Sequence, residues 1–307
     1  MLSPPAPILI AENLTKQIKG RTIVDSVSFR LQPGEVFGFL GPNGAGKTTT
    51  IRMLVGLIRP TAGRVQICGH DIERELESAL RCVGCIVETP DLYRFMTGRE
   101  NLEHFARMLG GIDPDEIDRV GSLVALSHRL HDRVRTYSLG MRQRLGIAQA
   151  LLGRPRVLIL DEPANGLDPA GIREMRELLR TLAHDEQIAV FVSSHLLAEV
   201  EMMCDRVAII HRGAILTTGT IAGLVIASHE TELVVDRIDL AVSIVTAIGV
   251  EHRTDHDRLF LRISEADIPP IIDRLVTAGV RIFRVAPRAK SLEELFLELT
   301  GVESSIE

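Results

Sequence analysis

A glycine-rich loop followed by a lysine is the first segment of this sequence whose residues could do chemistry. Its residues match the spacing G-x-x-x-x-G-K-[ST], and they run Gly41-Pro42-Asn43-Gly44-Ala45-Gly46-Lys47-Thr48, with Thr49 next. Glycines let successive backbone N–H groups point inward at phosphate oxygens, and the N-terminus of a following helix adds partial positive charge. Lys47 would reach the β- and γ-phosphates of a nucleotide, and the Thr48 hydroxyl would hold Mg²⁺. The alternative is an ordinary glycine-rich turn.

Two adjacent carboxylates, Asp161 and Glu162, directly follow the apolar run at residues 157–160. Ligands of open α/β sheets bind at the carboxyl ends of the strands, so this is the edge at which carboxylates could act. Asp161 would support Mg²⁺, and Glu162 would polarise an attacking water as a general base. Alone, such a pair is more often part of a solvated loop. Together with the glycine loop, it predicts nucleotide hydrolysis.

A third segment places small residues ahead of a predicted helix. It reads Tyr137-Ser138-Leu139-Gly140-Met141-Arg142-Gln143-Arg144-Leu145. On its own, this pattern is best interpreted as a helix N-cap at Ser138.

The predicted elements place these segments on an α/β sheet with a helical insertion. An early β region at residues 8–11 and 23–31 leads into a strand at 36–40, and a helix at 47–56 follows the glycine loop. Short apolar runs at 157–160 and 189–192 suit buried parallel strands, joined by a crossover helix at 172–184. Between them, residues 97–109, 115–126 and 138–152 are predicted to be helical.

The pattern changes beyond Gly219 to shorter alternating segments. We expect strands at residues 232–237, 251–254, 258–263 and 281–285, with helices at 240–248 and 268–278. This β-α-β-β-α-β order predicts a small ferredoxin-like α+β domain, with a last helix at 292–299. We therefore predict two domains, residues 1–219 and 220–307, with a helical subdomain at about 89–152 of the first.

Residues 8–219 taken together resemble the ATP-binding cassette (ABC) ATPases, which have a P-loop NTPase core. The segment at 137–145 is similar to the family signature, and it lies, as in the family, just before the Asp-Glu strand. Gly166-Leu167-Asp168 resembles the D-loop, and Ser193-Ser194-His195 resembles the switch-histidine segment. The resemblance implies that Ser138, Gly140, Gln143 and Asp168 help bind nucleotide, that His195 senses the γ-phosphate, and that two chains enclose two ATP molecules with Mg²⁺.

Two positions depart from the family pattern. Glu88 stands where the family normally has a glutamine that touches Mg²⁺ or the attacking water, and glutamate adds negative charge near phosphate. The aromatic side chain expected to stack on adenine near Gln17 is missing, which leaves Ile18 as an apolar cover for the base. In this respect the sequence resembles bacitracin-export and lantibiotic-immunity ATPases, which have a glutamate at the same place. Glu88 therefore remains a catalytic and metal-binding candidate.

The C-terminal segment, residues 291–301, also resembles the ending of drug and antibiotic exporter ATPases, although an amphipathic packing helix explains it equally well. We therefore expect an ATP-hydrolysing subunit that works as a pair with a second copy or a related ATPase subunit. It would drive export of a drug, antibiotic or peptide through a separate membrane permease. The alternatives are a soluble ABC ATPase that remodels nucleic acid or ribosomes, an ATP-dependent sensor or resistance module, and a P-loop kinase.

Composition narrows the class of partner and the location. The net charge of −6 disfavours sequence-independent nucleic-acid binding, which needs a concentrated cationic face, so we expect no nucleic-acid partner. No stretch approaches the roughly 20 apolar residues of a membrane-spanning helix, and residues 1–7 lack the layout of a secretory signal. We expect a cytoplasmic protein held at the inner face of the membrane by its permease. Cys82-x-x-Cys85 could suggest redox or zinc chemistry, but ordinary reduced thiols are the better interpretation.

Overall fold

A computed structural model describes residues 6–111, 113–226, 230–288 and 291–300 of the chain. The chain divides into two compact units, Met1–Gly219 and Thr220–Glu307. Each unit has its own sheet and its own apolar core, so each is described by itself.

A six-stranded sheet forms the centre of the first unit. Its order is β10 (Ala214–Thr220), β9 (Arg206–His211), β3 (Val36–Leu40), β8 (Ala189–Ser194), β7 (Val157–Asp161) and β6 (Val83–Ile86). The strands from β9 to β6 pair in parallel. All residues of β3, β7 and β8 are buried, as expected of apolar runs covered on both faces.

A second, antiparallel sheet packs on one face of the first. Its order is β2 (Arg21–Leu31), β1 (Leu9–Ile18), β4 (Ala62–Ile67) and β5 (His70–Asp71). Phe29 of this sheet packs on Phe37, Phe39 and Phe191 of the large sheet, with ring centroids 5.5 to 5.6 Å apart. Because side chains alternate along a strand, Gly38 faces the opposite side. A Cβ at that position would lie 2.7 Å from Val200 of α7 (Leu197–Met203).

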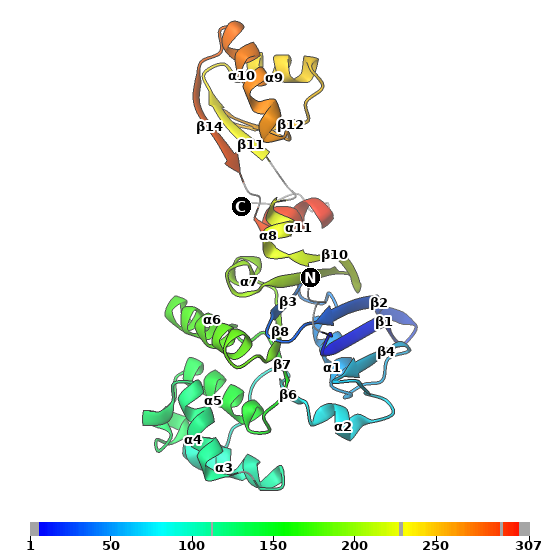
Figure 1. The fold of residues 1–307 in the computed structure, drawn as a ribbon, viewed down its shortest axis with the longest axis vertical. Helices are drawn as coiled ribbons and strands as arrows, with labels where there is room; N and C mark the ends of the chain where they lie inside the picture. Colours follow the sequence, from blue (N-terminus) through cyan, green and yellow to red (C-terminus); the bar gives the residue numbers. More distant parts are fainter. Residues whose placement is uncertain (1–5, 112, 227–229, 289–290, 301–307) are drawn as a thin grey trace. The chain divides into compact units, whose positions relative to one another are not determined.

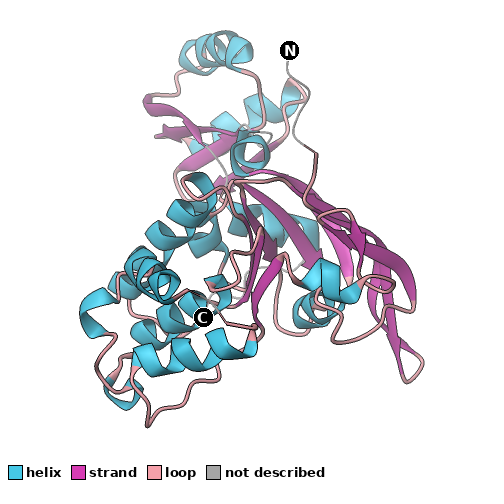
Figure 2. Cartoon of the chain, turned by 60° about the horizontal axis from the view of Figure 1, so that its bottom comes forward, coloured by secondary structure: helices cyan, strands magenta, loops and turns pink. Residues whose placement is uncertain are grey.

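Helices complete the two faces of the large sheet. Helix α1 (Lys47–Leu54) contacts β1, β2 and β7, and α6 (Pro169–His184) contacts β3 and β8. Figure 2 shows the helices of this unit lying alongside its magenta strands. A short helix, α2 (Leu76–Leu80), contacts β4, β5 and β6.

Helices α3 (Gly98–Met108), α4 (Pro114–Leu123) and α5 (Leu139–Leu151) form a helical block, visible in Figure 1 beyond β6 and β7. Each helix begins at a side-chain cap. Thr97 and Glu100 form a reciprocal capping box, Asp113 accepts from the amide of Asp115, and Ser138 accepts from that of Met141. Two 3₁₀ turns, Ser127–Arg129 and Val134–Thr136, connect α4 to α5.

The second unit has the predicted β-α-β-β-α-β order. Its elements are β11 (Glu230–Val235), α9 (Ile238–Ala247), β12 (His252–Asp255), β13 (Arg258–Leu261), α10 (Ile268–Thr277) and β14 (Ile282–Arg288). The strands pair antiparallel in the order β12-β13-β11-β14, and Leu233, Leu259 and Leu275 belong to one core. Short helices α8 (Ile221–Ile226) and α11 (Leu292–Thr300) flank this motif, and Gly301 of the exporter-like ending lies outside the described residues.

Several short elements were not predicted from the sequence, namely β4, β5, β9, β10, α2, α7 and α8. Three further differences have a clear physical reason. Strand β6 was missed because it is only four residues long and contains Gly84, where a Cβ would strike the carbonyl oxygen of Ala150 on α5. Helix α4 stops at Leu123 and not at residue 126, since Ala125 has φ of +54° and leaves the helical region. Helix α6 begins three residues before the expected start because Asp168 caps it.

The four cysteines form no disulfide in this fold. All four are free, and burial raises the pKa of Cys68 to about 12, with a hydrogen bond to Cys82 as a further cause. Across the described ranges, no group of three or more His, Cys, Asp and Glu side chains is arranged to hold a metal ion. In the same ranges, no helix combines the length and the apolar character needed to span a bilayer.

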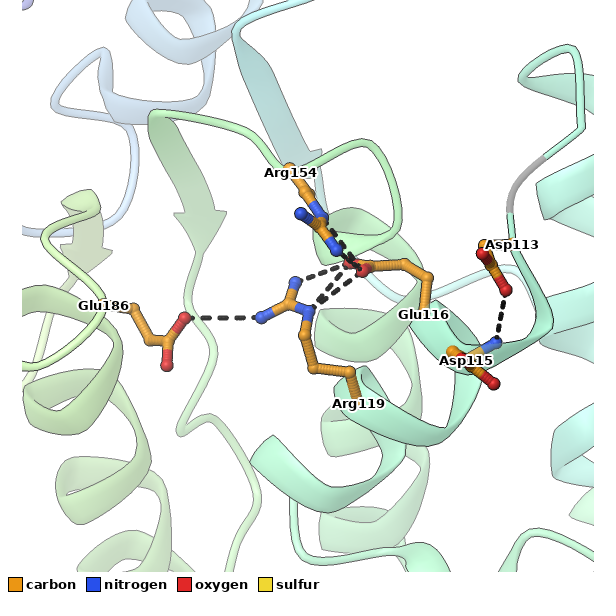
Figure 3. A network of polar contacts seen from close by, with 6 residues as sticks. All are labelled: Asp113, Asp115, Glu116, Arg119, Arg154 and Glu186. Carbon is orange, nitrogen blue, oxygen red and sulfur yellow. Dashed lines mark hydrogen bonds and ion pairs between the residues drawn. The ribbon is translucent and has the colours of Figure 1, made fainter.

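A buried carboxylate ties the helical block to the sheet region, as Figure 3 shows. Glu116 of α4 has a side chain only 3% exposed, and both its oxygens accept from Arg119 at 2.6 to 3.0 Å. Arg154, in the connection from α5 to β7, donates to Oε2 of Glu116 at 2.7 and 2.9 Å. Arg119 also donates to Glu186, which lies between α6 and β8, at 3.3 Å. Burial opposes ionisation of Glu116, but the two guanidinium groups lower its pKa overall.

We predict that Glu116→Gln destabilises the protein by about 2 kcal/mol, because it removes the buried negative charge shared by two guanidinium groups and replaces one acceptor oxygen with an NH₂ group. Since the folded-state pKa of Glu116 lies below its ordinary value of about 4.3, this stabilisation is present above that pH and is lost as the pH falls through the folded pKa. Urea denaturation at pH 7 and at pH 3.5 measures both effects, and the difference between variant and wild type should shrink at the lower pH.

The neighbouring exposed Asp115 supplies the control for this prediction. Asp115→Asn removes the same charge one position earlier on α4, and it should change the free energy of unfolding by less than about 1 kcal/mol. Equal effects of the two substitutions at pH 7 would show that the buried network does not tie the helical block to the sheet.

Candidate functional site

The polar segments singled out from the sequence converge at one edge of the large sheet. The register pairs Leu40 with Ser194, Asp161 with Ser193, and Ile86 with Leu160. Because these strands are parallel, their carboxyl ends lie side by side. The glycine loop follows β3 and His195 follows β8 directly. Asp161 is the last residue of β7, with Glu162 next, and Glu88 lies two residues beyond β6.

The glycine loop is shaped to present its backbone. Gly44 and Gly46 have φ of +80° and +106°, a region that only glycine adopts without strain. A Cβ at Gly46 would also lie 2.9 Å from the carbonyl oxygen of Ile23. Helix α1 starts directly after Gly46 with no side-chain cap, so its first N–H groups are available to an anion.

Lys47 turns back over this loop. Its side chain is buried, and Nζ donates to the carbonyl oxygens of Gly41 at 2.7 Å and Pro42 at 3.3 Å. Nζ also forms an ion pair with Oε1 of Glu162 at 3.2 Å. The structure therefore places a cation and a carboxylate in direct contact in front of the loop.

The predicted metal-binding residues meet in the same place. Thr48 Oγ1 donates to Oδ2 of Asp161 at 2.9 Å, and Asp161 is only 4% exposed. A hydroxyl and a carboxylate are the hard oxygen donors that Mg²⁺ prefers, and protein Mg²⁺ sites commonly supply one or two such groups and leave the rest to phosphate and water. Thr48 and Asp161 thus fit Mg²⁺ held together with a nucleotide.

Glu162 is held by β8 and carries an unusual backbone conformation. Its φ is +52°, and such a left-handed residue costs roughly 1–2 kcal/mol relative to the right-handed form. His195 Nδ1 lies 2.8 Å from Oε2 of Glu162. The Glu162 carboxylate is 23% exposed, so it is positioned by Lys47 and His195 while water still reaches it.

Glu88 occupies the adjacent strand end but points elsewhere. It is exposed, has φ of +71°, and forms an ion pair at 2.6 Å with Arg52 on α1. Sequence reasoning placed Glu88 among the catalytic and metal-binding candidates, and in this conformation its recorded partner is Arg52 and not Thr48 or Asp161. Arg52 itself was missed, although its place five residues after Lys47 on the predicted helix was visible in the sequence.

The signature and D-loop residues lie together on a second surface. Ser138 and Asp168 are exposed and each caps the helix that follows, while Gln143 is buried in α5. Gly140 packs beside Leu167, with its hypothetical Cβ 3.7 Å from that side chain. Their predicted contact with a nucleotide held by another chain remains a prediction, and Thr49, half-buried on α1, belongs to the predicted nucleotide-binding set on the same terms.

Glu199 of α7 is a further charged group near this site that sequence reasoning did not identify. Burial raises its pKa, with His195 lowering it and the negative charge of Glu162 raising it. It lies four residues beyond His195, on a short helix whose relation to the site only the fold reveals.

Comparisons with known proteins agree with this geometry. Residues 24–165 match the family described as ABC transporter. The uncharacterized ABC transporter ATP-binding protein YhcH of Bacillus subtilis (strain 168) is 48% identical over 295 residues, or 96% of each chain. The bacitracin transport ATP-binding protein BcrA of Bacillus licheniformis is 48% identical over 209 residues, or 68% of each chain. A solved structure described as the ATP binding subunit of an ABC transporter has a TM-score of 0.66 and 28% identity, covering 95% of this chain and 99% of that one.

Proposed function

Because this chain belongs to the ABC transporter family of ATP-binding proteins, we propose that its ATP hydrolysis drives export of a drug, antibiotic or peptide through a separate membrane permease. The convergence of Lys47, the Thr48–Asp161 pair and the Glu162–His195 pair at one sheet edge carries this proposal. The export part is supported by a relative described as a bacitracin transport ATP-binding protein. The protein would act at the cytoplasmic face of the membrane, where its permease holds it.

The proposed site works by exchange of partners. Entry of the triphosphate replaces the carboxylate of Glu162 as the partner of Lys47, so that Nζ and the loop amides hold the β- and γ-phosphates. Glu162, released on that side and still held by His195, accepts a proton from the attacking water. Thr48 and Asp161 would hold Mg²⁺ together with the phosphates, and the cation would neutralise phosphate charge.

A second subunit would complete this site. Within one chain, Ser138 and Gly140 lie at the start of α5. The Ser138 side chain caps only the amide of Met141, so other N–H groups of the first turn can face an anion. We propose that these residues contact the γ-phosphate held by a second copy or a related ATPase subunit. Asp168 would lie at the interface between the two subunits. The partner completes the nucleotide site in this arrangement.

A groove on the first unit is the proposed docking site for the permease. It has a volume of about 1230 Å³ and is bounded by α2, β6, α3 and α5. Met108, Leu109 and Leu76 line it while 69%, 59% and 44% exposed. Exposed apolar side chains gathered in one groove are typical of a surface that another protein covers. Since β6 leads directly to Glu88, this groove joins the nucleotide edge to the permease.

The second candidate function is an ATP-dependent sensor or resistance module that acts without a permease. The separate β-α-β-β-α-β unit, with a core of its own, is the observation that supports it. The two functions differ in the partner that stays bound when the protein is purified.

We predict that Glu162→Gln binds ATP at least as tightly as wild type but lowers kcat for hydrolysis by roughly a hundredfold or more, because an amide cannot accept the proton of water. Steady-state hydrolysis assays and equilibrium nucleotide titration measure the two quantities. Glu177→Gln, at an exposed position of α6, is the control and should retain wild-type kcat. Full hydrolysis by Glu162→Gln would remove Glu162 as the base.

We predict that Glu88→Gln keeps or raises basal hydrolysis, because it removes a negative charge near the phosphate site and frees Arg52. The variant should change the ratio of permease-stimulated to basal hydrolysis in the assembled complex. Glu12→Gln, which breaks the comparable surface pair with Arg64, is the control and should leave both rates unchanged. Complete loss of basal hydrolysis in Glu88→Gln would contradict this role.

We predict that Met108→Glu reduces recovery of the permease with the tagged chain at least fivefold, since it buries a charge against the docked apolar surface. Basal hydrolysis should stay within twofold of wild type. Val276→Glu on α10, at a comparably exposed apolar position, is the control. Purification in mild detergent, with the co-purified membrane protein quantified, provides the measurement. If wild type recovers no membrane protein, the sensor or resistance module is favoured and the transport proposal fails.

A further inference from the structure

Ser193, the last residue but one of β8, is a polar side chain that is completely buried beside the nucleotide edge. It lies directly opposite Asp161 in the parallel pairing of β8 with β7. A hydroxyl at such a position in a sheet core, where its neighbours in β8 are Val190, Phe191 and Val192, is costly unless both its donor and its acceptor are used.

Both are used, and both partners belong to the site. Ser193 Oγ donates to Oδ1 of Asp161 at 2.5 Å and accepts from the backbone N–H of Glu162 at 3.0 Å. The other oxygen of Asp161 faces Thr48. One hydroxyl thus orients the Asp161 carboxylate and contacts the backbone N–H of Glu162.

We infer that Ser193 is a positioning residue for the divalent cation and for the base of the reaction. With Oδ1 held by Ser193, Oδ2 of Asp161 is left toward Thr48, which is the side on which the cation would bind. The Glu162 amide donates both to Ser193 Oγ at 3.0 Å and to the Ser193 carbonyl oxygen at 3.2 Å. The hydroxyl therefore adds to a backbone bond in supporting the left-handed conformation (φ +52°) that carries the Glu162 carboxylate to Lys47 and His195. Ser193 and His195 are two residues apart at the end of β8. Ser193 contacts the amide of Glu162, and His195 contacts its carboxylate.

This inference rests on the proposed function, since it assigns a role toward Mg²⁺ in ATP hydrolysis. Substitution of Ser193 tests the orientation of the Asp161 carboxylate separately from its presence as a metal ligand, whereas removal of Asp161 would change both. Loss of Asp161 deletes a ligand, whereas loss of Ser193 keeps the ligand and frees its rotation. The expected signature is a weakened cation affinity with an unchanged affinity for nucleotide measured without cation.

The experiment measures Mn²⁺ binding to the purified full chain saturated with ADP, by the electron paramagnetic resonance signal of free Mn²⁺, so that no turnover is required. Ser193→Ala should weaken Mn²⁺ about tenfold, the range typical when a partner of a metal ligand is removed. Its ADP affinity in EDTA should stay within twofold of wild type, and kcat at saturating Mg²⁺ should fall at least tenfold. Ser193→Thr, which keeps the hydroxyl, should recover Mn²⁺ affinity to within threefold.

Ser194→Ala is the matched control, because it removes a buried hydroxyl of the same strand whose recorded bond is to the amide of Leu196. It should bind Mn²⁺ as wild type does. Ser193→Cys keeps the shape with a poorer donor, and it replaces Ser193→Ala if the alanine variant fails to fold. Wild-type Mn²⁺ affinity in Ser193→Ala or Ser193→Cys would overturn the inference while leaving the proposed function standing. Failure of wild type itself to bind Mn²⁺ with ADP would overturn the proposed function.

Discussion

The ion pair between Lys47 and Glu162 depends on how the parallel strands of the large sheet are aligned. Lys47 follows β3 and Glu162 follows β7, and β8 lies between them in register with both. That register brings the two side chains to 3.2 Å of each other, in front of the glycine loop. A phosphate is the natural replacement for the carboxylate, because it offers the lysine more negative charge and gives the loop amides an acceptor. Helices α1 and α6, which contact β3, β7 and β8, hold these strands in place.

Much of this site was predictable from the sequence because its residues follow short, fully buried strands. Apolar runs before the glycine loop, before Asp161 and before Ser193 locate three strand ends, and parallel strands share one edge. The pairs that join these ends were not predictable. Arg52 to Glu88, Ser193 to Asp161 and Glu116 to Arg154 connect residues 32 to 38 positions apart, and no local pattern records such contacts. Strand β6 escaped for the same reason, since its definition depends on α5 packing over Gly84.

The two carboxylates at adjacent strand ends have divided roles. Glu162 is held inside by Lys47 and His195, whereas Glu88 is held outside by Arg52. Both have left-handed backbones, a strain that is common where function fixes a side chain. The pair between Glu88 and Arg52 is exposed and therefore weak, so it can be exchanged at little cost when the site or its partner changes. The Glu116 network is the opposite case, because its carboxylate is only 3% exposed and would lose its compensating charges if the two guanidinium groups were removed. Rigid and exchangeable ion pairs thus occur in one unit.

The most direct test of the account is a crystal structure of the wild-type chain with Mg²⁺ and a non-hydrolysable ATP analogue. The account predicts that Lys47 Nζ leaves Glu162 and contacts the β- and γ-phosphates, with Thr48 and Asp161 at the cation. A complex in which Lys47 remains paired with Glu162, and the analogue lies away from residues 41–48, would contradict it.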